Sequence, residues 1–150
     1  MSKFSNHPFM FSCRVYWEDT DGGGVVYYAN YLKFMERART EWLRSLTIEQ
    51  TSLREQYGIL LVVARVEANF KRSARLDDLL QVSCKVIEQG KASISFEQNI
   101  YREGSSKELL FEGTTRVACI DASTFKPCAM PDVIVQALEN YQLTLRSHAK

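Results

Sequence analysis

Histidine is scarce in this sequence: His7 and His148 are the only two, and each lies near one end of the 150 residues. A buried histidine that acts as a general base, or a catalytic triad built on one, is therefore not expected. The sequence also contains no G-x-S-x-G, no G-x-x-x-x-G-K-[ST] and no G-x-G-x-x-G. These absences argue against a nucleophile elbow, a P-loop and a dinucleotide-binding turn.

Metal and disulfide signals are also missing. The chain has four cysteines that form no C-x-x-C pair: Cys13, Cys84, Cys119 and Cys128. Each stands where a small apolar residue would fit, so we expect reduced cysteines rather than disulfides or a zinc site. Asp19 and Asp21 begin like a calcium-binding loop, but the fifth position is Gly23 and the terminal glutamate is absent. We therefore predict neither a metal nor a cofactor.

Long apolar runs and an excess of one charge are absent as well. No run approaches the roughly 18 apolar residues that span a bilayer, and the first residues, whose apolar stretch is soon broken by Arg14, lack a signal-peptide layout. We expect a cytoplasmic protein without an integral membrane segment. The formal net charge of +1 gives no reason to expect nucleic acid as a partner. A length of 150 residues and a hydrophobic content of 45% suit a single domain, 1–150.

Hydrophobic periodicity predicts a strand followed by a long helix. Residues 9–17 alternate, with an apolar face formed by Phe9, Cys13, Val15 and Trp17. This alternation predicts a half-buried strand. From Tyr31 the spacing becomes helical, and its wide apolar arc predicts a buried helix with Tyr31, Phe34, Met35, Ala38, Trp42 and Leu46 inside. Asn30 suits the N-cap of this helix, and a start near Tyr27 fits as well.

The rest of the chain predicts a short helix at 48–56, four strands and a final helix. Four strands are expected, at 62–71, 80–87, 92–101 and 109–120. The apolar faces are Val62, Ala64, Val66, Ala68 and Phe70 in the first, Leu80, Val82, Cys84 and Val86 in the second, and Ile94, Phe96 and Ile100 in the third. The final helix is expected from Pro131, with Ile134, Leu138, Tyr141 and Leu145 on one face. Turns at Gly90 and Gly104 suit hairpins, so the predicted fold class is α+β with an antiparallel sheet curled around one helix. Its open edge strand favours edge-to-edge dimerisation.

A carboxylate cluster precedes the long helix: Glu18, Asp19 and Asp21, followed by three glycines. Such a loop is often no more than a solvated turn, and this interpretation stays beside a functional one. In the functional interpretation, Asp21 faces the helix start, where unpaired N–H groups stabilise an oxyanion. Thioester cleavage suits this pair, because a thiol with a pKa of about 8.5 leaves without much help from a general acid.

The segment V-Y-W-E-D-T-D-G-G-G-V-V-Y-Y-A-N-Y-L-K-F-M-E-R-A-R-T-E-W-L at 15–43 resembles the YbgC-type acyl-CoA thioesterases. These belong to the 4-hydroxybenzoyl-CoA thioesterase branch of the hotdog-fold superfamily, and a looser similarity extends to about Pro131. The resemblance implies a hotdog fold: a curled antiparallel five-stranded sheet wrapped around one long helix, plus a C-terminal helix. It also implies hydrolysis of acyl-CoA to free acid and CoA, and a homodimer with two sites at its interface, often assembled into a homotetramer.

The resemblance assigns two catalytic groups. The catalytic carboxylate is that of Asp21, the second aspartate of D-x-D, and the oxyanion donor is the backbone N–H of Tyr28. This assignment places the helix start before Asn30, with Asn30 in the first turn. Many relatives have histidine where this chain has Tyr28, so the backbone donor is kept and any role of an imidazole is lost. Whether Asp21 attacks the carbonyl or activates a water stays open.

Substrate-binding residues are assigned in the same way. Lys91 and Ser93 follow the turn at Gly90, where relatives bind the CoA nucleotide. The alternative phosphate ligands are Lys71, Arg72 and Arg75. All five side chains, these three and those of Lys91 and Ser93, are equally compatible with a plain solvated surface. Tyr27 and Tyr31 are candidates for lining the acyl channel, with core packing as the alternative.

Several other functions are weighed against this one. Other hotdog branches use a carboxylate from the long helix, but Glu36 and Glu41 fit better as ion-pair partners, for example Arg37 with Glu41. A hotdog dehydratase or hydratase is disfavoured by the missing internal histidine. A non-catalytic protein that binds acyl thioesters or acyl carrier protein, or serves as a scaffold, is the alternative from another class. The sequence leaves open whether CoA or acyl carrier protein carries the acyl group.

Overall fold

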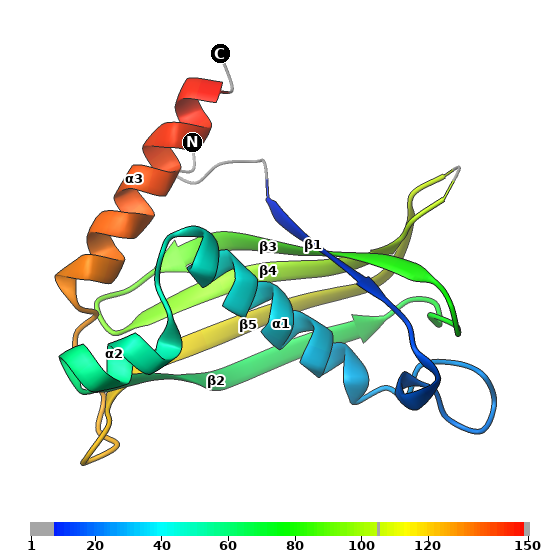
Figure 1. The fold of residues 1–150 in the computed structure, drawn as a ribbon, viewed down its shortest axis with the longest axis horizontal. Helices are drawn as coiled ribbons and strands as arrows, with labels where there is room; N and C mark the ends of the chain where they lie inside the picture. The colour runs from blue at the N-terminus through cyan, green and yellow to red at the C-terminus, as the bar shows by residue number, and fades with distance from the viewer. Residues whose placement is uncertain (1–7, 105, 149–150) are drawn as a thin grey trace.

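The computed structural model describes residues 8–104 and 106–148 and has an α+β architecture (Figure 1). One antiparallel sheet contains five strands in the order β1-β3-β4-β5-β2. The strands are β1 (Phe9–Arg14), β2 (Ile59–Phe70), β3 (Leu79–Gln89), β4 (Ser93–Arg102) and β5 (Glu108–Asp121). The helices are the 3₁₀ helix η1 (Trp17–Asp19), α1 (Asn30–Ser45), α2 (Gln50–Tyr57) and α3 (Asp132–His148). This arrangement confirms the predicted hotdog fold.

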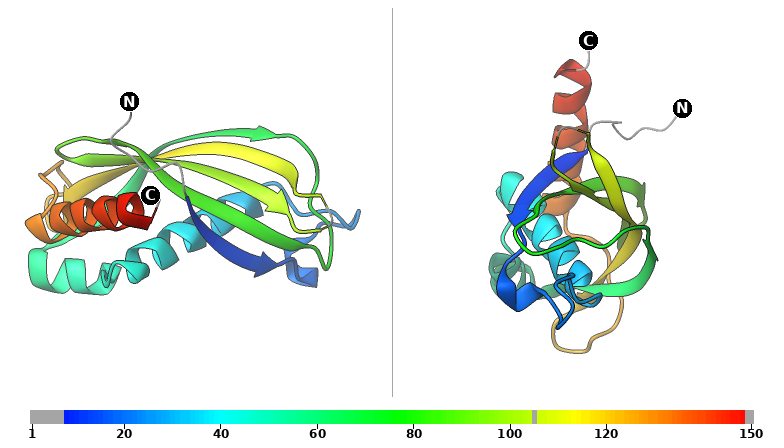
Figure 2. Two further views of the ribbon diagram at one scale, coloured as in Figure 1. Left: turned by 90° about the horizontal axis from the view of Figure 1, so that it is seen from above. Right: turned by 90° about the vertical axis from the view of Figure 1, so that its right-hand side faces the viewer.

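The sheet curls around α1, which lies along its concave face (Figures 1 and 2). The buried residues of α1 are Tyr31, Phe34, Met35, Ala38, Trp42 and Leu43. Burial of each large apolar side chain contributes roughly 1.5–3 kcal/mol, so this stripe fixes the helix against the sheet. Gly113 of β5 allows the close approach, since a Cβ there would lie 3.0 Å from the Cε of Met35. The predicted buried helix is confirmed, except that Leu46 follows its last residue and is half-buried.

The three inner strands match their predictions closely. The predicted apolar residues of β3 and β4 are all buried: Leu80, Val82, Cys84, Val86, Ile94, Phe96 and Ile100. The pairs β3–β4 and β4–β5 are antiparallel neighbours, as hairpins require. Each inner strand is hydrogen-bonded to another strand on both sides. This pairing fixes the register of the strand, so the residues that alternate onto its concave face enter the core.

The predicted alternation of β2 is wrong in its first half. A β-bulge between Val63 and Arg65 shifts the register against β5. Val63 pairs with the buried Val117, whereas Val62 pairs with Ala118 on the opposite face. The extra residue of a bulge reverses the side-chain phase, which a strict period of two cannot anticipate. As the edge strand, β2 is exposed from Val62 to Phe70 in the single chain.

The predicted first strand is too long. β1 ends at Arg14, and Trp17 begins η1 with 78% of its surface exposed. Val15 is fully buried, so the apolar face ends there. The backbone N–H of Tyr16 bonds the side chain of Asp19 instead of a neighbouring strand, which ends the extended conformation.

The remaining helices lie close to their predicted positions. α2 ends at Tyr57, and Gly58 follows with a φ of 64°, the left-handed conformation that glycine adopts at helix ends. α3 buries Ile134 and Leu138, and Tyr141 packs edge-on against Trp42. Leu145 lies outside the side chains that the structure describes. None of the described helices is long and apolar enough to cross a membrane.

Candidate active site

Asp19 connects the acidic loop to the start of α1. Its carboxylate oxygen Oδ2 accepts a 2.8 Å hydrogen bond from the N–H of Tyr16. Its backbone carbonyl accepts hydrogen bonds from the N–H of Tyr27, at 3.0 Å, and from the side-chain amide of Asn30, at 2.8 Å. All these contacts are structural, so Asp19 holds η1 against the helix start.

Asp21 lies at the tip of the same loop and is exposed. Its Oδ1 accepts a 2.7 Å hydrogen bond from the N–H of Gly23, and its own N–H donates to the carbonyl of Val25 at 2.9 Å. Gly24, with a φ of 80°, completes the turn in a conformation that suits glycine. Among the described residues, no donor bonds the second carboxylate oxygen. The Asp21 carboxylate is therefore accessible, unlike that of Asp19.

The start of α1 presents free backbone donors. Ala29 is the N-cap residue and α1 begins at Asn30. The suggestion that Asn30 caps the helix is therefore wrong, and so is a helix start before Asn30, although Asn30 does lie in the first turn. The N–H of Asn30 already bonds the carbonyl of Tyr27, and that of Tyr31 bonds the carbonyl of Tyr28. In the described part of the chain, the N–H groups of Tyr28 and Ala29 have no acceptor. Such groups carry partial positive charge and suit an oxyanion.

Aromatic rings surround these donors. Tyr27 and Tyr28, which are 48% and 64% exposed, pack against each other with ring centroids 5.0 Å apart. Tyr28 also contacts Phe70 at the end of β2, with centroids 6.3 Å apart. The backbone donor of Tyr28 therefore lies in an apolar, partly open setting, and Tyr27 remains a predicted contact for the acyl group.

Tyr31 is buried, with 3% of its surface exposed. Its ring stacks on Phe111, with centroids 5.4 Å apart and planes nearly parallel. Its hydroxyl accepts a 3.0 Å hydrogen bond from the N–H of Ala74. Burial raises the pKa of Tyr31, and the hydrogen bond from Ala74 acts in the opposite direction. These contacts give Tyr31 a packing role, and its predicted place along an acyl channel stays a prediction.

The connection between β2 and β3, residues 71–78, borders the loop of Asp21. The N–H of Val26 donates to the carbonyl of Ala74 at 2.8 Å, and Val25 forms an isolated β-bridge with Arg75. The sequence shows a charged cluster in this connection. Its pairing with a loop far earlier in the chain depends on tertiary contacts, which the order of residues does not indicate.

Lys91 and Ser93 lie at the other end of the sheet, in and beside the turn between β3 and β4 (Figure 1). Ser93 pairs with Ala118, whereas Phe111 contacts Tyr31 at the start of α1. At about 3.3 Å per residue, the seven steps from Phe111 to Ala118 along β5 span about 23 Å. A single chain therefore does not bring Lys91 and Ser93 to Asp21.

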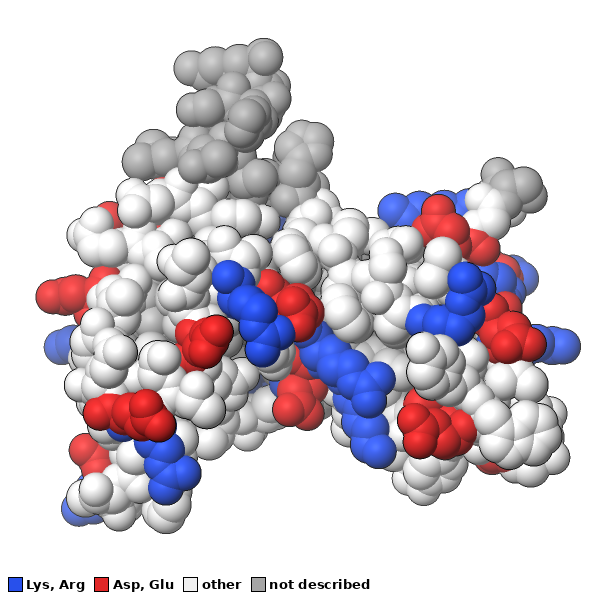
Figure 3. All heavy atoms as spheres, viewed as in Figure 1, with Lys and Arg blue, Asp and Glu red and all other residues white. Residues whose placement is uncertain are grey.

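The helix carboxylates have ordinary surroundings. Glu41 forms an ion pair with Arg44, not with Arg37 as suggested by the sequence, and the guanidinium of Arg37 lies 5.9 Å from the ring centre of Phe34. Glu36 is exposed. Basic and acidic side chains run across the middle of the face on which α1 lies (Figure 3). This mixture indicates a solvated helix surface.

A groove of about 320 Å³ lies between α1, the start of α2 and the first half of β2. Its apolar lining is Trp42, Leu43, Leu61, Val62, Val63, Ile94, Phe96 and Val117, and Glu36, Arg39 and Gln50 add polar groups. Arg39 donates a 2.9 Å hydrogen bond to the fully buried Gln98, and partial burial lowers the pKa of this arginine. Among the side chains that the structure describes, those of residues 8–104 and 106–142, no cluster of three or more metal-binding groups is present.

Comparison with known proteins identifies relatives along nearly the whole chain. Residues 15–138 match the model of the thioesterase-like superfamily. The acyl-CoA thioesterase YbgC of Haemophilus influenzae is 44% identical over 135 residues, which cover 90% of this chain and 97% of that protein. The acyl-CoA thioesterase YbgC of Helicobacter pylori is 34% identical, with 84% and 96% covered.

Solved structures agree with these sequence relatives. A probable thioesterase from Bartonella henselae is 34% identical, with a TM-score of 0.77 and coverage of 83% of this chain and 100% of that one. The 1,4-dihydroxy-2-naphthoyl-CoA thioesterase Slr0204 of Synechocystis has the same fold, with a TM-score of 0.82, 24% identity and coverage of 89% and 97%. The chain therefore belongs to the thioesterase-like superfamily, among its YbgC-type members.

Proposed function

We propose that this protein is an acyl-CoA thioesterase in which Asp21 is the catalytic carboxylate. One observation carries the assignment to this residue. The accessible carboxylate of Asp21 and the unbonded backbone N–H of Tyr28 lie on one loop at the start of the buried helix α1. The YbgC-type relatives of this protein support hydrolysis of acyl-CoA as the reaction.

The proposed reaction begins with the thioester carbonyl oxygen against the N–H of Tyr28. This donor and the positive end of the α1 dipole stabilise the negative charge that develops on the oxygen. Asp21 then follows one of two routes. It attacks the carbonyl carbon, expelling CoA thiolate and leaving a mixed anhydride that water hydrolyses, or it removes a proton from a water that attacks. Both routes yield the free acid and CoA.

The proposed active unit is a homodimer joined through β2. Two copies of this edge strand, paired antiparallel about a two-fold axis, continue the sheet from one subunit into the other. The axis would bring the end of β2, next to the loop of Asp21, toward the start of the partner's β2 and the groove beside it. An acyl chain held in that groove would then meet the loop of Asp21 at the interface between the subunits. Further assembly into a homotetramer stays a prediction.

The same pairing explains the place of Lys91 and Ser93 in the proposal. Both lie at the end of the sheet where β2 begins, since Val62 and Ser93 pair with the same residue, Ala118. In the antiparallel dimer this end faces the partner's Asp21 loop. Lys91 and Ser93 would therefore meet the CoA nucleotide of a substrate held by the partner subunit.

A cytoplasmic location is part of the proposal. The four cysteines form no disulfide, not even Cys119 and Cys128, whose sulfur atoms lie within hydrogen-bond distance at 3.6 Å. Two thiols this close would be prone to oxidation to a disulfide in a secreted protein, whereas a reducing compartment such as the cytoplasm keeps them as thiols. Acyl-CoA or acyl carrier protein would supply the acyl group.

The test compares Asp21→Asn with Glu18→Gln, an exposed carboxylate of the same loop without a catalytic role. Hydrolysis of a panel of acyl-CoAs is followed by trapping the released thiol. We expect kcat to fall by about 100-fold or more in Asp21→Asn, the usual scale for losing a catalytic base, and to change little in Glu18→Gln. Near wild-type turnover of Asp21→Asn contradicts the assignment. Acyl-CoA binding by the wild type without thiol release would favour a non-catalytic acyl-thioester binding protein.

A further inference from the structure

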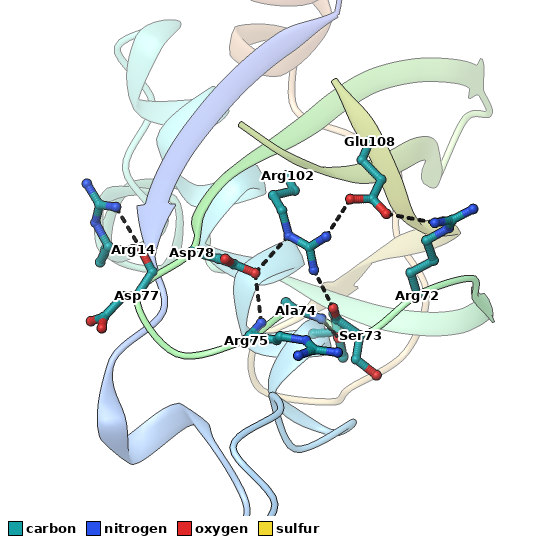
Figure 4. Close-up of polar contacts among 10 residues, drawn as sticks. Arg14, Arg72, Ser73, Ala74, Arg75, Asp77, Asp78, Arg102 and Glu108 are labelled. Carbon is teal, nitrogen blue, oxygen red and sulfur yellow. Dashed lines mark hydrogen bonds and ion pairs between the residues drawn. The ribbon is translucent and has the colours of Figure 1, made fainter. Parts of the chain in front are cut away.

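Arg102, near the end of β4, fastens the connection of residues 71–78 to the sheet (Figure 4). Its Nε donates a 2.9 Å hydrogen bond to Oδ2 of Asp78, and its Nη2 donates one of 2.6 Å to the carbonyl of Ser73. Its Nη1 forms an ion pair with Glu108 of β5. One guanidinium thus holds both ends of the connection and the neighbouring strand.

Asp78 extends this attachment toward β1. Its Oδ2 also accepts a 2.8 Å hydrogen bond from the N–H of Arg75, which closes the second half of the connection into a turn (Figure 4). Its backbone carbonyl accepts a 2.9 Å hydrogen bond from the N–H of Val15, and the N–H of Asp77 returns one of 3.0 Å to the carbonyl of Val15. Asp78 therefore joins the connection to Val15, the residue that follows β1.

The connection in turn holds the loop that carries Asp21. The carbonyl of Ala74 accepts from the N–H of Val26, and the N–H of Leu76 donates to the carbonyl of Gly24 at 3.4 Å. The N–H of Ala74 bonds the hydroxyl of Tyr31 in the first turn of α1. The loop of Asp21 and the start of α1 thus rest on the same short segment. Among the described residues, Arg102 forms no hydrogen bond or ion pair with either of them.

The rate of the proposed reaction depends on how the loop of Asp21 is placed relative to the start of α1. An error of about 1 Å in the placement of a reacting group can cost 100-fold in rate. Exposed loops open locally at low free energy unless packing or hydrogen bonds hold them. The carboxylate of Asp21 is exposed and lies on such a loop, so its position depends on the segment beneath.

We propose that Arg102 and Asp78 are positioning residues of the thioesterase reaction, which hold the 71–78 connection so that the Asp21 loop stays aligned with the start of α1. This inference rests on the proposed function of Asp21. It assigns a functional role to an ion pair that otherwise resembles an ordinary contact within the fold.

The experiment compares Arg102→Gln and Asp78→Asn with two matched controls. Arg44→Gln and Glu41→Gln each break the exposed ion pair between these two residues at the far end of α1, away from the connection. We expect kcat to fall about 10- to 100-fold in the first two variants, with KM within about threefold, in line with a small displacement of the reacting groups. We expect both controls to stay within about threefold in kcat.

Hydrogen exchange of single amides separates positioning from general loss of structure. In Arg102→Gln, the amides of Val26 and Leu76 should exchange about tenfold faster or more, whereas those of the inner strand β4 keep their wild-type rates. The double variant Arg102→Gln/Asp78→Asn should cost no more in kcat than the worse single variant, because both residues act through one contact. Arg102→Lys, which keeps a cation beside Asp78, should recover part of the loss and remains measurable if Arg102→Gln does not fold.

Three results would overturn the inference: unchanged kcat in Asp78→Asn, a loss in Glu41→Gln as large as in Asp78→Asn, or unchanged exchange at Val26. Failure of the proposed function has a different signature. In that case Asp21→Asn keeps its turnover or the wild type releases no thiol, whereas the exchange rates at Val26 and Leu76 still report whether Arg102 holds the loop.

Discussion

The hydroxyl of Tyr31 accepts a 3.0 Å hydrogen bond from the backbone N–H of Ala74, and both residues are buried. This bond joins the first turn of α1 to the connection between β2 and β3. Tyr31→Phe would leave the amide of Ala74 without an acceptor, which costs about 1–3 kcal/mol for a buried donor. We expect a loss of that size in the free energy of unfolding, measured by urea titration at fixed protein concentration. Tyr57→Phe, at an exposed tyrosine, should change it by less than about 0.5 kcal/mol. Equal effects of the two variants would contradict the role of this bond.

Gly24 tests the backbone of the Asp21 loop. Its φ of 80° lies in the left-handed region, although nothing lies within 4 Å of a Cβ placed there. Gly24→Ala should therefore destabilise the protein by about 1 kcal/mol through backbone strain alone. Gly22 has equal space and no positive φ, so Gly22→Ala is the matched control and should be neutral or slightly stabilising. Urea unfolding of both variants checks this difference, and a neutral Gly24→Ala would show that the turn relaxes.

Val66 tests the proposed dimer. It lies in the middle of the edge strand β2 with 38% of its surface exposed in the single chain. A lysine on an edge strand opposes pairing with another edge, so Val66→Lys should shift the protein to monomers at micromolar concentration and lower its activity. Sedimentation velocity measures the shift. Ile87→Lys, at a similarly exposed position of the inner strand β3, should leave the dimer intact. A dimeric Val66→Lys would mean that the copies meet elsewhere.

Cys84 tests the link between burial and pH dependence. Burial raises the pKa of the Cys84 thiol well above its ordinary value of 9.0, and the nearby Arg39 acts in the opposite direction. The folded state therefore keeps a proton that the unfolded state releases above pH 9, so this contribution to stability is present below pH 9 and is lost as pH rises further. The slope is up to about 1.4 kcal/mol per pH unit for one group. Unfolding free energies measured from pH 8 upward should fall less steeply in Cys84→Ala than in the wild type.

Cys13 provides an internal comparison for this prediction. Burial raises the pKa of Cys13 to about 11, so its contribution should be lost between pH 9.0 and about 11. The slope difference between Cys13→Ala and the wild type should therefore fade near pH 11. Parallel curves for the wild type and both variants would contradict the pKa shifts.

Periodicity predicted the inner elements because burial there is one-sided and continuous. α1 and the strands β3 and β4 show the expected apolar faces, and Gly58 follows α2 as its C-cap. The misses occur where local contacts interrupt the period. A hydrogen bond from Tyr16 to Asp19 turns the chain into η1, and the bulge after Val63 reverses the alternation of β2.

The candidate catalytic groups were also predicted from the sequence, through the resemblance of residues 15–43. The supporting contacts were not. Arg102 and Asp78 are both distant in sequence from the acidic loop, and the sequence around neither one resembles that of a catalytic group. Their connection to Asp21 passes through backbone hydrogen bonds of Gly24, Val26 and Ala74, for which residue type carries little information.

The sequence by itself determined which segments are apolar on one face, which loop carries the acid, and which family the chain resembles, because side-chain chemistry and spacing are written in residue order. Only the tertiary structure decided that Asp19 is bound into the loop while Asp21 is accessible, and that Lys91 and Ser93 lie at the other end of the sheet. The physical reason is that hydrogen bonds and strand pairing join residues distant in the chain, and the free energy of those contacts depends on positions in space.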